Sequence, residues 1–488
     1  MRKNIYFTTT KGNHYLYIEG LQCSIFLPPG LIQVMNGEDD NIANEQEKEY
    51  YQKKYLFLKE NGLDKKTNIS FITKPDPEIV KIKLANIRQI LIEVTDGCNL
   101  KCKYCGYGEM YENYDKRLSQ KMPFEKVETL FEYLIDLWHS NYNFSFNNNV
   151  DVSFYGGEPL LNMDLIKTTI DYLSKKKISN MNFSYRMTTN ALLLDRYMDF
   201  LVDKNFNLLI SLDGDEYSNS YRVDKNGKNS FFKVYNNILL LKDKYPEYYA
   251  KHVNFNAVLH DRNTYEGIYL FIKHSLNKNP LISELNDNGI KEEKVEMFRR
   301  MYKNTYEHQK EAYETNSEIH EDSSFSRAEN VAIRSILHAH TGNSYKSINH
   351  LLKEKQQIVH MPSGTCMAFY KKIFLTVNGK IFPCEKIGQN YPLGYVLFNK
   401  VCIDFEQISN LYKQMYEPIL KLCEQCYHQV NCGQCVFNIA QKKKKKGLYC
   451  PSFVNKKVMA DYMSENISYL EENRTIYEKI INHNIEVR

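Results

Sequence analysis

Cysteine is the residue type whose placement points most directly to chemistry in this chain. Three of the twelve cysteines lie within eight residues, with the spacing Cys98-x3-Cys102-x2-Cys105, and residues 106–365 contain none. Eight more follow in the C-terminal part: Cys366, Cys384, Cys402, Cys423, Cys426, Cys432, Cys435 and Cys450. In a reducing compartment, thiols grouped in this way are typical of metal or iron-sulfur ligands rather than of disulfides.

The first group has the ligands for an open iron-sulfur cluster. Three thiolates hold three irons of a cubic 4Fe–4S cluster and leave the fourth iron free for a substrate or cofactor. An open coordination position is typical of catalytic metal sites. The triplet alone also fits a zinc site completed by a distant His or Cys, or three buried structural thiols.

The elements expected around this group are those of an α/β fold. Short apolar strands alternate with amphipathic helices between residues 87 and 286, and the expected strands cover 89–98, 150–159, 182–190, 207–214 and 252–260, with a sixth near PLISELN. Repeated strand–helix units predict a parallel sheet with right-handed crossovers. We therefore expect a partial (β/α)6 TIM-like barrel, with the first cysteines just past the carboxyl end of its first strand, where such folds bind ligands.

The rest of the chain divides into four further parts. We expect a small α+β unit over residues 1–86, with a helix through 44–61. A polar helical bridge is expected over 287–359, with 292–314 as one long helix. A Cys-rich domain over 360–455 and a C-terminal helix over 456–488 complete the chain.

Composition narrows the class of protein. Apolar residues make up 43% and charged residues 25%, which excludes a disordered chain. The net charge of +5 is too small for this length to predict a nucleic-acid partner. No long uncharged apolar run and no signal peptide are found, so we expect a cytoplasmic protein without a membrane partner.

The segment DGCNLKCKYC, residues 96–105, resembles the signature of radical S-adenosylmethionine (radical SAM) enzymes. In that family a 4Fe–4S cluster reduces bound SAM to methionine and a 5′-deoxyadenosyl radical. The resemblance includes Tyr104, the aromatic residue before the last cysteine. It implies that Cys98, Cys102 and Cys105 hold the cluster and that Tyr104 belongs to the cofactor-binding residues.

Three later segments at successive expected strand ends resemble motifs of the same family. Residues 156–159 resemble the GGEP motif, which implies that the backbone of Gly156 and Gly157 and the carboxylate of Glu158 hold the SAM amino group. Residues 189–190 and 211–214 resemble the TN and SLDG segments, which implies that Asn190 and Ser211 line the same cavity. Glycines permit close backbone approach, and a carboxylate accepts bonds from an ammonium.

One arginine near these motifs has two readings. Arg222 follows the SLDG segment by eight residues. We expect Arg222 either to pair with the carboxylate of SAM or to be a surface arginine.

The C-terminal cysteines resemble the SPASM domain, an extension that carries two auxiliary 4Fe–4S clusters on radical SAM enzymes that modify peptides. The resemblance implies one cluster on Cys366, Cys384 and Cys435, and a second on Cys423, Cys426, Cys432 and Cys450. The spacing before Cys435 is two residues where the family pattern has three. Taken alone, the two C-x2-C pairs also fit a zinc knuckle.

The first auxiliary cluster lacks an evident fourth ligand. Either Cys402 or a non-cysteine ligand completes the cluster, or one iron stays open and binds a substrate thiolate. Alternatively, Cys402 is a core cysteine, as we expect of Cys23. Glu385 follows Cys384 at a position where related sulfatase-maturating enzymes use an acid as proton acceptor. Glu385 is therefore a candidate catalytic residue, or otherwise a solvated glutamate.

The resemblance implies a peptide maturase that uses the radical to install a thioether or carbon–carbon crosslink in a ribosomally made precursor peptide. A reductant such as flavodoxin or ferredoxin would supply the electron. The N-terminal unit has the size of a leader-peptide recognition element, or it is a cap on the barrel. The alternatives are a sulfatase-maturating, formylglycine-generating enzyme and a zinc-binding structural protein.

Overall fold

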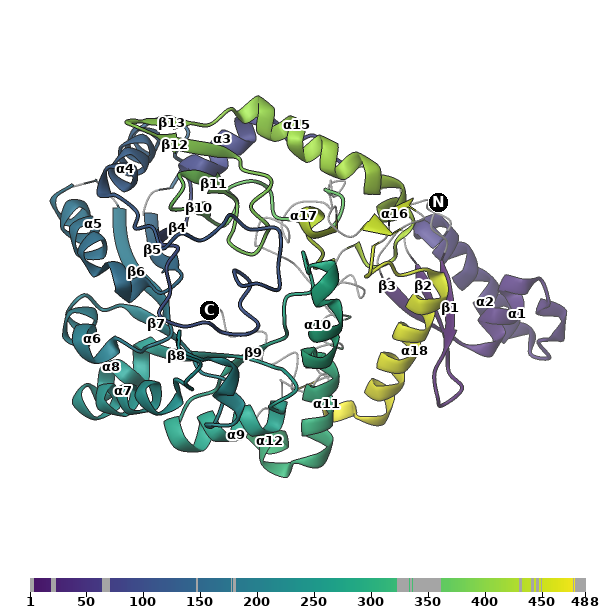
Figure 1. The fold of residues 1–488 in the computed structure, drawn as a ribbon. Helices are drawn as coiled ribbons and strands as arrows, with labels where there is room; N and C mark the ends of the chain where they lie inside the picture. Colours follow the sequence, from purple (N-terminus) through teal and green to yellow (C-terminus); the bar gives the residue numbers. More distant parts are fainter. Residues whose placement is uncertain are drawn as a thin grey trace.

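The computed structural model describes residues 4–18, 23–63, 71–145, 148–176, 178, 181–322, 333, 336, 361–429, 432–439, 443–444, 447–448, 450–476 and 478. Its centre is a run of six parallel strands (Figure 1). They are β4 (Gln89–Thr95), β5 (Asn148–Gly156), β6 (Met181–Thr189), β7 (Asn207–Ser211), β8 (Val253–Val258) and β9 (Leu281–Ser283). Each pairs in parallel with the next, which confirms the predicted α/β fold and all six expected strands.

Helices between the strands form the outer layer of this half of the molecule (Figure 1). They are α4 (Phe124–Trp138), α5 (Met163–Lys175), α6 (Leu194–Asp203), α7 (Phe231–Lys244), α8 (Pro246–His252) and α9 (Tyr265–Leu276), with short 3-10 helices η3 (Pro159–Asn162) and η4 (Ser218–Tyr221). The helical period places apolar residues on one face, so α4 buries Val127, Leu130, Phe131 and Leu134 against the strands.

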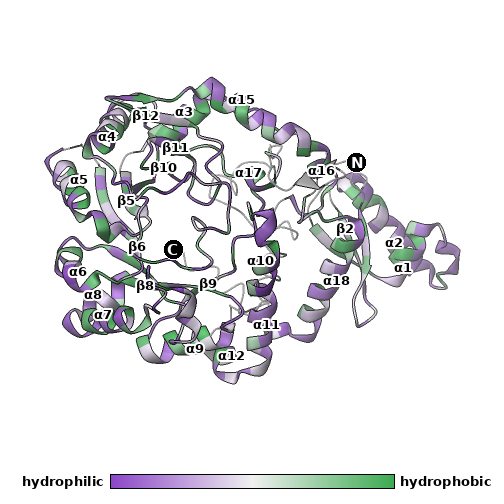
Figure 2. Cartoon of the chain, viewed as in Figure 1, coloured by the Kyte–Doolittle hydropathy of each residue, from purple (hydrophilic) through white to green (hydrophobic). Residues whose placement is uncertain are grey.

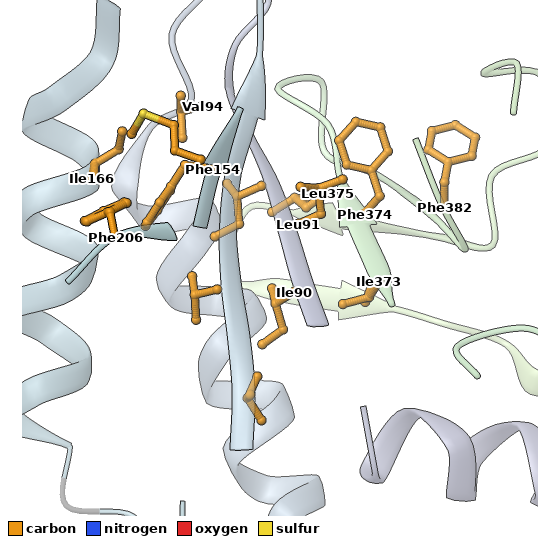
Figure 3. Close-up of a cluster of buried hydrophobic side chains, with 14 of the residues drawn as sticks. Ile90, Leu91, Val94, Phe154, Ile166, Phe206, Ile373, Phe374, Leu375 and Phe382 are labelled. Atoms are coloured by element: carbon orange, nitrogen blue, oxygen red, sulfur yellow. The ribbon is translucent and has the colours of Figure 1, made fainter. Parts of the chain in front are cut away.

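The Cys-rich region adds four strands to the same sheet. These are β10 (Ile373–Leu375), β11 (Lys380–Phe382), β12 (Gly394–Leu397) and β13 (Lys400–Cys402). β10 pairs in parallel with β4, and Figure 3 shows Ile90 and Leu91 beside Ile373 and Leu375 in one core. The C-terminal region is therefore packed onto the barrel through a continuous sheet of ten strands.

Helices and two short strands alternate with the loops that hold most of the later cysteines, and Cys423 lies in α16 itself. α15 (Phe405–Tyr416), η6 (Glu417–Ile419) and α16 (Leu420–Gln425) lead into α17 (Val436–Ile439), the two-residue strands β14 (Lys443–Lys444) and β15 (Gly447–Leu448), and α18 (Lys456–Glu472). No helix within the described residues is both long and apolar enough to cross a membrane.

The N-terminal unit is a three-stranded antiparallel sheet with helices, as predicted. It contains β1 (Ile5–Thr8), β2 (His14–Ile18), β3 (Cys23–Leu27), α1 (Pro29–Asn36), η1 (Asp39–Asn41), α2 (Glu45–Leu58), the turn η2 (Lys59–Leu63) and α3 (Pro77–Ala85). Cys23 packs in the cluster between the sheet and α1 and α2, as expected of a core cysteine. The other face packs on α18, where Tyr15 donates a hydrogen bond of 2.8 Å to Glu471 (Figure 1).

The expectation of one long helix over 292–314 is wrong. The segment contains η5 (Glu292–Lys294), α10 (Val295–Met301) and α11 (Thr305–Thr315), followed by α12 (Ser317–Asp322). The backbone is extended at Tyr302, and the side chain of Asn304 caps α11 by accepting from the amide of Glu307 at 3.1 Å. Figure 2 shows that α11 is largely hydrophilic, so little burial on this helix opposes the break. Most of the expected bridge beyond residue 322 lies outside the described residues.

Candidate functional site

The first cysteine group lies in a loop that leaves the carboxyl end of β4. The loop is held by antiparallel pairing to residues 221–224, with Lys101 N donating to Val223 O at 2.7 Å and Lys103 N to Tyr221 O at 3.1 Å. Burial raises the pKa of Cys98 to about 11 and of Cys102 to about 12. Neighbouring thiols raise both pKa values further: Cys105 contributes to each of them, and Cys98 contributes to that of Cys102. The three thiols therefore lie near one another.

This donor set fits an iron-sulfur cluster. Among the described residues, no three His, Cys, Asp or Glu side chains converge tightly enough for a single metal ion. A cluster of four irons keeps its thiolates farther apart than one zinc ion does, and binding lowers the pKa of each ligand thiol. The thiols of Cys98, Cys102 and Cys105 are half-buried, and their role as ligands of such a cluster stays a prediction.

Glycine is required at positions 156 and 157, at the end of β5, because the neighbouring backbone leaves no room for a side chain. A Cβ on Gly156 would lie 2.1 Å from the Thr95 carbonyl, and one on Gly157 would lie 1.9 Å from the Gly97 carbonyl. The amides of Gly157 and Glu158 donate to those two carbonyls at 2.9 Å each. The close approach is thus between β5 and the start of the cysteine loop, while a contact of these glycines with SAM stays a prediction.

Glu158 joins the ends of β5 and β6. Its buried carboxylate accepts hydrogen bonds from Thr189 Oγ1 at 2.6 Å, from Asn190 N at 2.8 Å and from Leu160 N at 3.1 Å. The side chain of Asn190 in turn donates to Asn99 Oδ1 at 2.8 Å and lies 3.8 Å from Cys98 Sγ. Three of the predicted motifs are therefore brought together around one carboxylate.

Glu158 predicts a pH dependence of stability. Burial raises its pKa to about 7 from the ordinary value of 4.5. Between those values the folded protein binds a proton that the unfolded chain does not, so stability falls as pH rises through this window, by up to about 3 kcal/mol. We expect Glu158→Gln to lose this slope, measured as unfolding midpoints of metal-free protein between about pH 5 and about pH 8. Equal slopes in the two proteins would contradict the assignment.

The SLDG segment follows β7 and contains the centre of a buried polar network. Asp213 accepts two hydrogen bonds from Arg222, Nε to Oδ2 and Nη2 to Oδ1, both at 2.9 Å, and one from the hydroxyl of Tyr104. Arg222 is therefore buried and ion-paired, so the expectation of a surface arginine is wrong, while a contact with the carboxylate of SAM stays a prediction. Ser211 instead donates to Asn256 Oδ1 of β8 at 3.0 Å.

Four C-terminal thiols line one cavity. Its lining includes all four cysteines implied for the second auxiliary cluster: Cys423, Cys426, Cys432 and Cys450. Close packing holds the cavity together, because a Cβ on Gly364 would lie 1.6 Å from the Cys432 carbonyl. The four thiols converge as predicted, and their role as ligands stays a prediction.

The other three implied ligands surround Tyr412. The charges of Cys366, Cys384 and Cys435 all add to the raised pKa of the Tyr412 hydroxyl, which is set mainly by burial. The Tyr412 hydroxyl donates to the Cys366 carbonyl at 3.3 Å. Cys402 lies on edge strand β13, where it lines a surface groove beside α15. It is thus only half-buried, rather than a core cysteine.

Glu385 and Cys105 of the first cysteine group lie near the same two tyrosines, Tyr114 and Tyr155. Its carboxylate is 15% exposed and pairs with Lys372 Nζ at 3.0 Å, so it is not a solvated glutamate. Burial chiefly raises the pKa values of Tyr155 and Tyr114, and the charges of Glu385 and Cys105 add to both. Lys372, Tyr114 and Tyr155 were not among the residues predicted from the sequence.

Residues 92–274 match the family model described as the radical SAM superfamily. A cysteine-type anaerobic sulfatase-maturating enzyme from Clostridium novyi is 29% identical over 42% of this chain and 54% of its own length. The radical SAM cyclopropyl synthase TigE from Paramaledivibacter caminithermalis is 25% identical over 37% of each chain. The chain thus spans about half or less of these relatives.

The fold is also similar to a solved structure. The structure of native anSMEcpe with bound AdoMet and the Cp18Cys peptide has a TM-score of 0.54 and 18% identity, over 82% of this chain and 99% of that one. Enzymes of the superfamily use a 4Fe–4S cluster with SAM, which agrees with the donor set after β4. Residues 92–274 are therefore a radical SAM domain.

Proposed function

We propose that this chain is a peptide maturase that uses the radical SAM reaction to install a thioether or carbon–carbon crosslink in a ribosomally made precursor peptide. The observation that carries the proposal is that the barrel loop and the Cys-rich region each bring a thiol near Tyr114. The charges of Cys105 from the barrel loop and of Cys384 and Glu385 from the Cys-rich region all act on Tyr114. A substrate bound beside Tyr114 would therefore be near both the barrel loop and the Cys-rich region.

In this proposal the barrel loop holds the cofactors. Cys98, Cys102 and Cys105 bind the cluster, which with SAM supplies methionine and a 5′-deoxyadenosyl radical when bound. Glu158 receives the ammonium of SAM, because a buried carboxylate with a raised pKa gains most from an opposite charge. Asn190 lies beside Cys98 and so reaches the same cofactor.

The C-terminal thiols hold two auxiliary clusters in the SPASM manner. Four thiols in one cavity supply every protein ligand of a 4Fe–4S cluster. The group around Tyr412 supplies three, which leaves one iron for another ligand or for a substrate thiolate. The reaction takes place in the cytoplasm, where flavodoxin or ferredoxin supplies the electron.

The N-terminal unit is proposed to bind the leader of the precursor. β3 pairs with β2 alone among the described strands, so it is an edge to which an extended peptide adds. Phe26 on this edge strand is 48% exposed and offers an apolar contact for the added strand.

Sulfatase maturation is the second candidate, favoured by the similarity to the Clostridium novyi enzyme and to the solved fold. The two candidates differ in the product that they form. Formylglycine carries an aldehyde. Formation of a crosslink removes hydrogens from the peptide and produces no aldehyde. TigE supports the crosslink, since a cyclopropane ring requires a new carbon–carbon bond.

The test is anaerobic incubation of cluster-reconstituted protein with SAM, dithionite and two peptide samples. One sample contains the short peptides encoded beside this chain's gene, and the other is the Cp18Cys peptide. We expect a hydrogen loss without an aldehyde in the first sample and no change in the second. An aldehyde on the Cp18Cys peptide would establish the sulfatase candidate, and no change in either sample would count against both.

A further inference from the structure

A buried ion pair behind the first cysteine group has no part in the function proposed above. Asp213 is fully buried, and the Arg222 side chain is 9% exposed. Both carboxylate oxygens of Asp213 are occupied, since Val258 N donates to Oδ1 at 3.0 Å in addition to the bonds from Arg222 and Tyr104. His260 Nε2 lies 3.7 Å away from the same carboxylate.

The ion pair contacts the cysteine loop at Tyr104, between Cys102 and Cys105. Tyr104 lies two residues after Cys102 and one before Cys105, and its buried side chain is bonded to Asp213. The Arg222 guanidinium lies 5.5 Å from the centre of the Tyr104 ring, and its charge acts directly on the thiol of Cys102. On both sides of Arg222, the backbone of Tyr221 and Val223 pairs with residues 101–103.

We propose that Asp213 and Arg222 are positioning residues: the ion pair anchors the Tyr104 hydroxyl and thereby fixes the loop that carries Cys102 and Cys105. The pair also keeps the charge beside Cys102 balanced. A bidentate pair holds its partners in one geometry, which a single hydrogen bond does not do. The part of this inference that concerns charge rests on the proposed cluster, and the part that concerns the loop does not.

The loop is tested in metal-free protein by the rate at which each cysteine is alkylated, measured by mass spectrometry under native conditions. Tyr104→Phe removes only the hydroxyl, and we expect alkylation of Cys102 and Cys105 to become about tenfold faster because the loop opens more often. Tyr111→Phe is the matched control, since Tyr111 packs in the same cluster and donates instead to the Asn286 carbonyl at 2.8 Å. Cys366 serves as the internal reference thiol.

The charge is tested by the reduction potential of the cluster bound to Cys98, Cys102 and Cys105, followed by electron paramagnetic resonance. Asp213→Asn leaves a cation unpaired beside Cys102 and should raise the potential, whereas Arg222→Gln leaves an anion and should lower it. Arg222→Lys keeps the charge and loses the two-point contact, so it should speed alkylation with a smaller change in potential.

Two results would overturn the inference. Equal alkylation rates in Tyr104→Phe and Tyr111→Phe would show that the hydroxyl does not hold the loop. Shifts of potential in the same direction for Asp213→Asn and Arg222→Gln would show that these variants act by general disruption. If the protein binds no cluster, the proposed function fails, and the alkylation experiment still decides the positioning role.

Discussion

Replacing Cys98, Cys102 and Cys105 together by alanine is expected to abolish formation of 5′-deoxyadenosine from SAM. The three thiols lie near one another after β4, and Glu158 is near Cys98. Without them the protein loses one cluster of three, so bound iron should fall from about twelve to about eight atoms per chain. Iron and sulfide are quantified on anaerobically reconstituted protein, beside an assay for 5′-deoxyadenosine.

Cys402→Ala is the matched control for this experiment. Cys402 lines a surface groove at the edge of the sheet and is not among the seven cysteines proposed to hold the auxiliary clusters. We expect it to keep both the iron and the SAM cleavage of the unchanged protein. Zinc in place of iron, or SAM cleavage that survives in the triple variant, would return the cysteines to a structural role.

Glu385→Gln is expected to uncouple SAM cleavage from modification of the peptide. The glutamine keeps the size of the side chain but accepts no proton, so modification should slow by about a hundredfold while 5′-deoxyadenosine still forms. The residue pairs with Lys372 in the Cys-rich region and is not a proposed ligand of the first cluster. Peptide product and 5′-deoxyadenosine are measured in the same reactions.

Lys372→Met separates the role of the carboxylate from that of its ion pair. Removing the lysine leaves Glu385 in place without its partner at 3.0 Å. We expect a smaller loss of modification than in Glu385→Gln, because the proton acceptor is still present. An equal loss in the two variants would assign the effect to the broken pair, and unchanged modification in Glu385→Gln would remove this residue from the reaction.

The barrel was predictable because local pattern determines it. Apolar strands such as β4 and β6 are short and alternate with helices whose apolar residues recur at the helical period. Carboxyl ends of neighbouring parallel strands meet at one edge, so Cys98, Glu158 and Asn190 were expected together, and one carboxylate joins them. The spacing of the motifs was therefore enough to predict this part of the site.

Long-range partners were not predictable in the same way. Nothing in the local pattern of residues 373–375 shows that β10 pairs with β4, because that contact depends on which sheet edge is open. Arg222 was placed at SAM or at the surface because the pattern of one segment does not show the burial of Asp213. The pairing of Lys372 with Glu385 had a signal, since the Asn378-Gly379 turn predicts a hairpin that places 372 beside 384–385.

The origin of the hydrogen in 5′-deoxyadenosine tests the central claim most directly. The short peptides encoded beside the gene are made fully deuterated and incubated anaerobically with cluster-reconstituted protein, SAM and dithionite. Abstraction of a hydrogen atom from the peptide predicts deuterium in 5′-deoxyadenosine, together with a crosslinked product. Crosslinked peptide with no deuterium in 5′-deoxyadenosine, or 5′-deoxyadenosine formed at the same rate without peptide change, would contradict the account.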